Sequence, residues 1–346
     1  MSEGVFNVVA FGRQSAGTTA VAATTVFPVD AGFLGFELDR AAESPDEDYG
    51  STSREQAGRE SYGIRWATAS LPFVARFQDI IHALEMHVGV VSGGTPVGTA
   101  SPYTYTNTYD ESGSSLFTGL KPYTVEYGVD GSTQDEWKAY GVVADTLELG
   151  FDALSAPGNS MWKGTLGLVA LAREGTAIQG TAIAAPATLE TMEGHLTTLS
   201  EGPVGTAFAS LAALTGSLKQ FSLNSTNNAS GRAYGGTSDK ATDIGRSGKG
   251  EVEFSALIGI SATSKTDILD IFDVSGSVPT ERRWRIKCTG SGVNTFTIDA
   301  RVRFRATNVG EHEGERLYAV EGVFVKDSTL GGRGQFITTN AVATIP

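Results

Sequence analysis

The sequence predicts a mostly β protein (α+β) with two tandem related β-sandwich domains, each with one flanking helix, plus extended arms and long loops. Three observations predict this class. The 346 residues include 43 glycines, with Thr, Ser and Val also abundant, a composition that favours strands and tight turns over long helices. Many short stretches alternate apolar and polar residues, as half-buried strands do. The two halves of the chain also repeat the same order of elements.

The repeat is visible around Phe36 and again around Phe221. In both places an alternating strand is followed by a polar Gly/Ser loop that carries a tyrosine, Tyr49 or Tyr234, and then by a second strand. The separation is 185 residues in both cases (221 − 36 and 234 − 49). Duplicated units commonly pack beside copies of themselves. The repeat therefore predicts an assembly rather than an isolated catalyst.

The first half reads as strands, one helix and further strands. Strands are expected at 33–39 and at 62–71, where Trp66 is matched to Phe254 of the second half. The apolar spacing of SLPFVARFQDIIHALEM predicts a helix over 70–86, with Pro72 in its first turn. The later strands are expected in PYTVEYG, ADTLELGFD and MWKGTLGLVAL.

The second half repeats this order. Its helix is expected in SATSKTDILDIFDV, and its later strands in RRWRIKCTG, TIDARVRFRAT and RLYAVEGVFV. The later matching elements of the two halves are separated by fewer residues than the earlier ones. An insertion in the first half, 87–121, explains this difference, and it contains the strand-like PYTYTNTY. The expected organisation is an N-terminal arm (1–30), a first β domain (31–175), a connector (176–212), a second β domain (213–328) and a C-terminal arm (329–346).

Composition limits the possible function classes. The net charge of −13 lies almost entirely in residues 1–180, which carry 10 Lys and Arg against 22 Asp and Glu. An acidic chain is a poor candidate for gripping nucleic acid, because that affinity depends on neutralised phosphates. The single cysteine, Cys288, allows no internal disulfide and reads as a small core residue. No apolar run approaches the ~20 residues that span a bilayer, so we expect no membrane insertion, and the first residues lack the pattern of a secretory signal.

A search for catalytic or metal-binding patterns yields none. His82 and His87 are five residues apart, the wrong spacing for two ligands on one helix face. The chain has no nucleophile elbow, phosphate-binding lysine loop or dinucleotide fingerprint. The acidic run Asp46, Glu47 and Asp48 lacks the alternating spacing of a calcium loop, so a solvated loop is favoured. We expect no enzyme activity and no catalytic, cofactor or metal residues.

Two strands of the second half carry regularly spaced cations. Because side chains alternate along a strand, one face should present Arg283, Arg285 and Lys287, and another Arg301, Arg303 and Arg305. The matching positions of the first half include Glu126 and Glu148. One hypothesis is that these faces meet where first and second domains of an assembly adjoin. The alternative is that they are solvated faces neutralised by neighbours such as Asp299.

Several longer segments resemble one known family. They are AFGRQSAGTTAVAATTVFPV, SPYTYTNTYDESG leading into PYTVEYG, YGVVADTLELGFD, LKQFSLNSTNNASGRAYGG and DIGRSGKGEVEFSALI. In element order and sequence texture they resemble the major tail protein, or tail tube protein, of long-tailed, siphovirus-like bacteriophages, in its duplicated-domain type. The resemblance covers most of the chain but includes no invariant motif.

The resemblance implies a structural subunit of the virion, made in the host cytoplasm. A duplicated chain would form homotrimeric rings with pseudo-sixfold symmetry, stacked into a tube whose channel conducts viral DNA. In such a ring the cationic and acidic strand faces would meet between alternating first and second domains; a further alternative is that the arginines contact DNA in the channel. Its partners would be itself and other tail proteins: the tape measure, tail terminator and distal tail proteins. Long loops over 40–61 and 225–248 would contact the next ring and order only on assembly; they contain Asp46, Glu47, Asp48, Tyr49, Arg232 and Tyr234. The alternatives are a virion receptor-binding or decoration protein and a hydrolase with scattered carboxylates.

Overall fold

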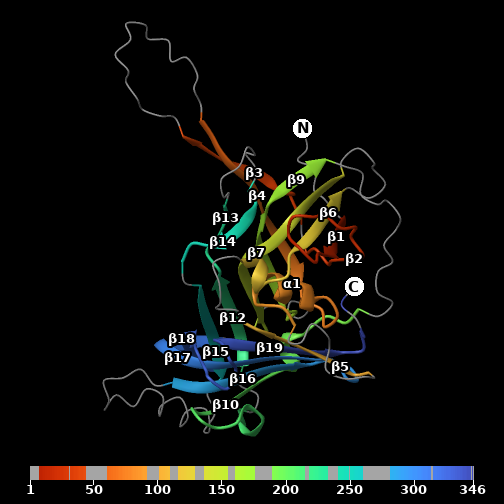
Figure 1. Ribbon diagram of the computed structural model, residues 1–346. Coiled ribbons are helices and arrows are strands. Elements are labelled where there is room, and N and C mark those ends of the chain that lie inside the picture. Colours follow the sequence, from red (N-terminus) through yellow and green to blue (C-terminus); the bar gives the residue numbers. More distant parts are fainter. Residues whose placement is uncertain are drawn as a thin grey trace, which may run out of the picture.

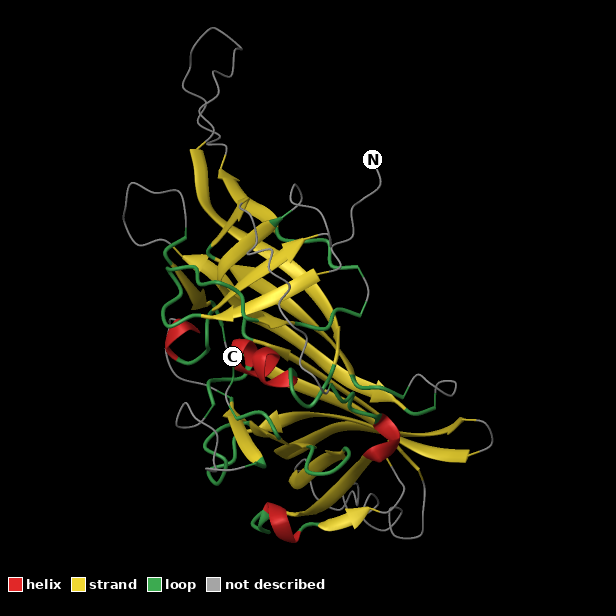
Figure 2. Cartoon of the chain, turned by 90° about the vertical axis from the view of Figure 1, so that its right-hand side faces the viewer, coloured by secondary structure: helices red, strands yellow, loops and turns green. Residues whose placement is uncertain are grey.

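The computed structural model describes residues 8–30, 32–43, 61–91, 101–109, 116–128, 136–154, 160–175, 189–214, 218–232, 241–248, 250–259, 281–312, 315–343 and 345. Within this part of the chain the fold is mostly β, as predicted, with large antiparallel sheets and one α-helix, α1 (Ile80–His87). Every residue of α1 is buried, as expected of a helix with an apolar majority all round. Figure 2 shows it between the upper and lower groups of strands.

The strands of the first half are β1 (Val8–Arg13), β2 (Thr25–Val26), β3 (Glu37–Glu43), β4 (Ser61–Val74), β5 (Tyr103–Thr108), β6 (Tyr123–Gly128), β7 (Trp137–Asp152), β8 (Lys163–Ala170) and β9 (Ala172–Gly175). They pair antiparallel in two series that share β7. The first part of β7 belongs to the series β2-β1-β6-β7-β9, and its second part to β3-β4-β8-β7. A long strand that changes partners in this way links the two layers of a sandwich.

The strands of the second half are β10 (Thr197–Pro203), β11 (Ala212–Leu214), β12 (Leu218–Thr226), β13 (Ala229–Arg232), β14 (Asp243–Arg246), β15 (Glu251–Gly259), β16 (Glu281–Thr289), β17 (Thr295–His312), β18 (Glu315–Val325) and β19 (Gly334–Asn340). Their pairing repeats that of the first half. The series are β11-β10-β16-β17-β19 and β12-β15-β18-β17, with β17 in the place of β7. β13 and β14 form a separate hairpin.

A bulge in each long strand aligns the two halves. In β7 the bulge falls at Asp145, between Ala144 and Thr146, and in β17 it falls at Arg305, between Phe304 and Ala306; the separation is 160 residues (305 − 145). Across the neighbouring strands, this alignment matches Ala69 of β4 with Phe254 of β15, a separation of 185 (254 − 69). The predicted match of Phe254 with Trp66 was therefore out of register by three residues.

The two halves are joined edge to edge. β7 pairs with β12 from Asp152 opposite Gln220 to Thr146 opposite Thr226. This joint creates one antiparallel sheet in the order β3-β4-β8-β7-β12-β15-β18-β17, which runs through both groups of strands in Figure 1. The predicted insertion strand is β5, and it crosses over to pair with β19 of the second half.

Apolar side chains from both halves share one core cluster, beside two smaller clusters of buried residues. Phe73 of β4 and Phe254 of β15 belong to one cluster of buried residues. Trp162, just before β8, packs against Phe221 of β12 with ring centroids 5.9 Å apart. In the second half, Phe254 of β15 contacts Trp284 of β16, a strand of the other series, with ring centroids 5.0 Å apart, so the two layers face each other. Because the core is shared, the division into two domains stays a prediction.

The helix predicted over 70–86 begins later than its pattern suggested. Residues up to Val74 belong to β4, and α1 starts only at Ile80. The carbonyl oxygen of Pro72 accepts a hydrogen bond from the backbone N–H of Asp30, on the side of β4 away from β8. The missing N–H of Pro72 also faces that side, so the proline is compatible with a strand. The second predicted helix, 261–274, lies outside the described residues.

Both terminal segments contribute to the core sheets. Residues 8–13, within the predicted N-terminal arm, form β1, where Val9 and Phe11 are fully buried. Residues 334–340, within the predicted C-terminal arm, form β19, paired between β17 and β5. The segment predicted as a connector holds β10 and two short 3₁₀ turns, η3 (Gly194–Leu196) and η4 (Phe208–Ser210). The two predicted arms and the predicted connector therefore each contribute a strand to the sheets.

Candidate assembly surfaces

The joined sheet has one face in the core and one face turned outward. Its outward residues are mainly small, polar or acidic, and we call them the polar face: Thr68 and Ser70 on β4, Lys163 and Thr165 on β8, Thr146 and Glu148 on β7, Ser222 and Asn224 on β12, Glu251, Glu253 and Ser255 on β15, and Glu321 on β18. The alternation of buried and exposed residues along β12 and β15 is the pattern of a sheet solvated on one side.

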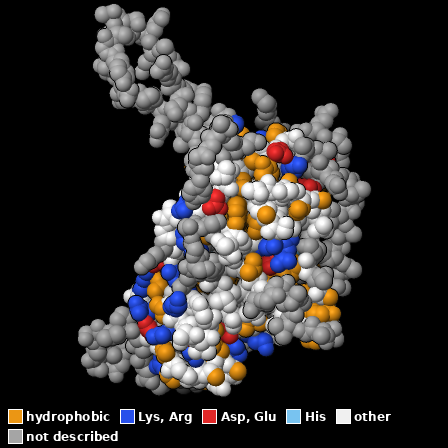
Figure 3. Space-filling view, viewed as in Figure 1, with side chains coloured by type: hydrophobic (Ala, Val, Ile, Leu, Met, Phe, Trp, Pro, Cys, Tyr) orange, Lys and Arg blue, Asp and Glu red, His pale blue; other side chains and the backbone are white. Residues whose placement is uncertain are grey.

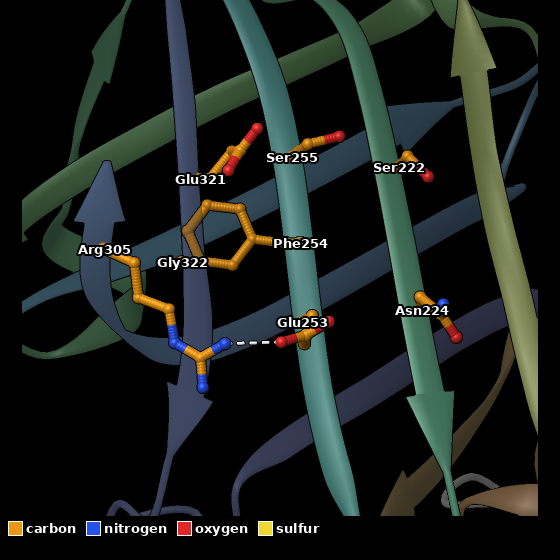
Figure 4. Close-up of a pocket in the computed structure, with 8 residues that line it drawn as sticks. All are labelled: Ser222, Asn224, Glu253, Phe254, Ser255, Arg305, Glu321 and Gly322. Carbon is orange, nitrogen blue, oxygen red and sulfur yellow. Dashed lines mark hydrogen bonds and ion pairs between the residues drawn. The ribbon is translucent and has the colours of Figure 1, made fainter. Parts of the chain in front are cut away.

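A shallow hollow of about 220 Å³ lies on the second-half part of the polar face. Figure 4 shows Glu253, Glu321 and Arg305 around it, with Phe254 at its floor beside Gly322. A Cβ atom on Gly322 would lie 2.7 Å from the ring of Phe254, so the glycine leaves room for that ring. Arg305 forms ion pairs with Glu253 and with Glu251. The hollow therefore combines the ion pair of Arg305 and Glu253 with an aromatic floor.

A second, wider hollow of about 470 Å³ follows the joint between β7 and β12. Glu148 and Asp152 line it from β7, and Gln220 and Ser222 line it from β12. Lys163 stands on its β8 side and forms an ion pair with Asp30 at 2.8 Å. The hollow is an open groove with mixed polar walls rather than an enclosed pocket, which is the form of an extended contact surface.

Of the arginines predicted on the cationic strand faces, Arg285, Arg301, Arg303 and Arg305 are at least partly exposed, and each is paired within the chain. Arg301 and Arg303 both contact Glu281 of β16, at 2.6 and 2.5 Å. Two nitrogens of Arg285 donate to the carboxylate of Asp299 at 2.7 Å. This is the neutralisation by Asp299 that one of the alternatives named. Charge pairs at an exposed strand face contribute little to stability. Figure 3 shows Lys and Arg interspersed with Asp and Glu on the visible side of the second half.

Arg283 departs from the predicted strip because it is buried, with 5% of its surface exposed. Its Nε and Nη2 donate to the carboxylate of Asp327 at 2.9 Å, and Nη1 donates to the carbonyl oxygen of Thr206 at 2.7 Å. The guanidinium also lies over the ring of Phe208, 4.8 Å from its centroid. Arg283 therefore fastens two loops to β16 and cannot present its charge to a neighbour, whereas Lys287 on the same strand is exposed.

The two predicted acidic counterparts also differ from each other. Glu126 of β6 is buried, and its Oε1 accepts a hydrogen bond from the N–H of Ala23 at 3.3 Å, so its assignment to a surface strip was wrong. Glu148 is exposed on the polar face, as predicted. By the bulge alignment, however, the first-half equivalents of Arg303 and Arg305 are Val143 and Asp145, so Glu148 is the counterpart of neither.

Of the six residues predicted to reach the next ring, one is described. Arg232 lies in β13, and its guanidinium donates to the carbonyl oxygen of Arg246 in β14. The other five, Asp46, Glu47, Asp48, Tyr49 and Tyr234, lie outside the described residues. The structure narrows both predicted loops. β3 extends to Glu43 inside 40–61, and β13 and β14 lie inside 225–248, so the segments flanked by hairpin strands are 44–60 and 233–240.

A buried polar network between the halves was not predicted. His87, at the end of α1, contacts the hydroxyl of Ser225 in β12 through Nε2 at 2.8 Å. Asn227 donates through Nδ2 to the carbonyl oxygens of His87 and Ala144, and it receives a hydrogen bond from Arg246 at 3.1 Å. Burial lowers the pKa of His87 to about 4, so the imidazole is neutral at pH 7.

A second buried network lies inside the first half. Arg13 of β1 donates through two nitrogens to Glu85 of α1, at 2.8 and 2.7 Å, and Glu85 is fully buried. The hydroxyl of Tyr123 donates to the same carboxylate at 2.8 Å. Burial also lowers the pKa of the neighbouring His82 to about 4. Polar residues inside the apolar pattern of α1 were the sequence signal for this network, but their partners are 38 and 72 residues away in the chain.

Neither network has the composition of a metal centre. Among the described residues, no three His, Cys, Asp or Glu side chains gather closely enough to hold a metal ion. The described part of the chain also contains no helix with the length and apolar character needed to cross a bilayer.

Comparison with known proteins gives no match: no protein-family model matches the chain, and no curated protein matches it.

Proposed function

We propose that this chain is a structural subunit of a bacteriophage tail tube, assembling into stacked trimeric rings that conduct viral DNA. The observation that carries the proposal is the repeated pairing scheme. β12-β15-β18-β17 repeats β3-β4-β8-β7, and the two copies of this unit stand side by side in one sheet. A subunit that already places two equivalent units edge to edge is suited to continue the same arrangement with further copies.

The polar face suits the lining of a DNA channel. It carries Glu148, Glu251, Glu253 and Glu321, while Lys163 and Arg305 on it are paired with carboxylates. A lining without free cations would not hold phosphates, so DNA could pass without being retained. The proposal therefore places the polar face towards the ring axis. The opposite arrangement, with arginines gripping DNA, is disfavoured because Arg301, Arg303 and Arg305 are neutralised within the chain.

The alternative, a virion receptor-binding or decoration protein, predicts a different assembly. Such a protein would form a closed oligomer with no tendency to extend into filaments. Negative-stain electron microscopy of the purified protein separates the two possibilities. Hollow rings that stack into tubes support the tail tube, whereas discrete closed oligomers at every protein concentration support the alternative. Tubes whose length becomes uniform only with a tape measure protein would add the predicted partner.

A further inference from the structure

We infer that the open edge of β3 in one copy of the chain binds the second part of β17 in the next copy, as an antiparallel strand pair of defined register. The choice of a second copy as the partner rests on the proposed function. The argument itself uses the joint between β7 and β12, which is an internal example of the same contact.

The two ends of the joined sheet are open among the described residues. β3 pairs with β4 on one side and has no described strand on the other. Beyond Arg303, β17 pairs with β18 on one side and likewise has no described strand on the other. An unpaired edge exposes a row of backbone donors and acceptors that another strand can satisfy. By the repeat, these two edges are equivalent to β12 and β7, which pair with each other.

The internal joint defines the register from the β3 side. Ala67 of β4 and Val252 of β15 are equivalent, since both are two residues before the matched pair described above (252 − 67 = 185). Leu38 lies opposite Ala67, and Ser225 lies opposite Val252, so Leu38 is the equivalent of Ser225. In the joint, Ser225 lies opposite Leu147.

The β17 side follows from the bulges. The separation of 160 residues makes Thr307 the equivalent of Leu147. The expected backbone register between copies is therefore Leu38 opposite Thr307, with Glu37 opposite Asn308 and Asp39 opposite Ala306. The strands run antiparallel, as β7 and β12 do.

A pair of glycines supports this register. Gly150 lies opposite Ser222 in the joint, and a Cβ atom on it would overlap the carbonyl oxygen of Phe221, so the close approach of β12 requires glycine there. Its equivalent in β17 is Gly310 (310 − 150 = 160). A Cβ atom on Gly310 would meet nothing within 4 Å. Nothing within the single chain requires a glycine at this exposed strand position. In the expected register Gly310 lies opposite Gly35, two residues before β3, so the segment that leads into β3 would approach Gly310 as β12 approaches Gly150.

Exposed apolar side chains point to the same edge. Leu34 and Leu38 are 65% and 49% exposed, although both flank or belong to β3. Ser225, the equivalent of Leu38, is 1% exposed because β7 and α1 cover it. Covering Leu38 with a second copy would remove apolar surface from water, which stabilises the contact.

Thiol cross-linking tests the register directly. Cys288 is buried, so accessible thiols come from the introduced residues. In a variant with Leu38→Cys and Thr307→Cys, residues directly opposite on paired strands would be close enough to bridge. The matched control has Glu37→Cys and Thr307→Cys, which places the cysteines on opposite faces of the shared sheet. We expect mild oxidation to produce covalent dimers and trimers from the first variant and monomers from the control.

Substitution of Gly310 provides an independent test. We expect Gly310→Val to leave the unfolding transition of the isolated chain unchanged, because the site is open, and to reduce assembly at least tenfold in light scattering. Ser255→Val, exposed in the middle of the polar face, is the control that should assemble normally. Tubes that form normally with Gly310→Val and fail to cross-link through 38 and 307 would overturn the inference while leaving the proposed function intact. Cross-linked closed oligomers that never form tubes would support the inference and overturn the proposed function.

Discussion

The imidazole of His87 contacts the hydroxyl of Ser225 at 2.8 Å. This contact links α1 of the first half to β12 of the second half. Both groups are buried at the joint between β7 and β12. Asn227 completes the network through the carbonyl oxygens of His87 and Ala144. The joint is therefore held by specific polar contacts as well as by strand pairing, which favours a fixed arrangement of the two halves.

Protonation of His87 should weaken the fold below pH 6.5. Its pKa falls from 6.5 in the unfolded chain to about 4 in the fold, because burial disfavours the cation. The unfolded chain thus binds the extra proton between these values, and stability that is fully present above pH 6.5 is lost as pH falls towards 4. The loss is roughly 3 kcal/mol at most.

Urea denaturation of the wild-type chain and of His87→Gln, from pH 7.5 to 4, measures this effect. The variant should lose less stability over that range than the wild type, because one proton fewer is taken up on unfolding. His195→Gln is the matched control, because the side chain of His195 is exposed. Equal slopes for the wild type and His87→Gln would contradict a buried neutral His87.

Removal of the buried carboxylate in α1 should be costly. Glu85→Ala leaves the guanidinium of Arg13 and the hydroxyl of Tyr123 without their shared partner. Breaking one side of a buried ion pair costs about 3–5 kcal/mol. Glu253→Ala removes a carboxylate from the exposed pair with Arg305 and should cost less than about 1 kcal/mol. Similar midpoint shifts for both variants in chemical denaturation would argue against the Glu85 network.

Gly150→Ala should weaken the internal joint. The added methyl group would overlap the carbonyl oxygen of Phe221, so β12 must shift away from β7. Overpacking of this kind typically costs about 1–3 kcal/mol. Gly310→Ala, at the equivalent but open position, should change the unfolding free energy by less than about 0.5 kcal/mol. Thermal unfolding of the two variants side by side gives the comparison, and equal losses would count against their different environments.

Charge reversal at Arg303 and Arg305 should impair assembly. Glutamates at these positions would stand beside Glu281, Glu251 and Glu253, and the added negative charge would lie next to the β17 edge that is proposed to meet a second copy. Lys138→Glu, a charge reversal on β7 outside both cationic strand faces, is the control. Sedimentation of assembled material should fall for the double variant only; normal pelleting of that variant would remove these arginines from the interface hypothesis.

The strands that alternate over many residues could be predicted from the sequence. β4, β8, β16 and β18 correspond to expected strands, because along most of each strand one face is buried and the other is at least partly exposed. β6 was also expected, although every one of its residues is buried. The start of α1 could not be placed, since Leu71 and Phe73 fit both a helix stripe and a strand alternation. Pairing with β8 favours the strand, and such a partner is distant in the sequence.

The partners of buried charges were equally inaccessible to sequence reasoning. Strand alternation placed Arg283 on an outward face correctly, but the loop that carries Asp327 covers it. Likewise, the strand pattern of β5 predicted its existence but not its pairing with β19 in the other half. Local periodicity shows which side of a strand is apolar, whereas long-range contacts decide which residues cover its polar side.

Cryo-electron microscopy of the assembled protein tests the central claim most directly, because it shows whether the two halves occupy equivalent positions around one axis. The account predicts hollow rings of three chains with six similar units, in which the contact between chains repeats the β7–β12 joint and the polar face lines the channel. Rings in which the two halves lie at different radii, or particles without a central channel, would contradict it.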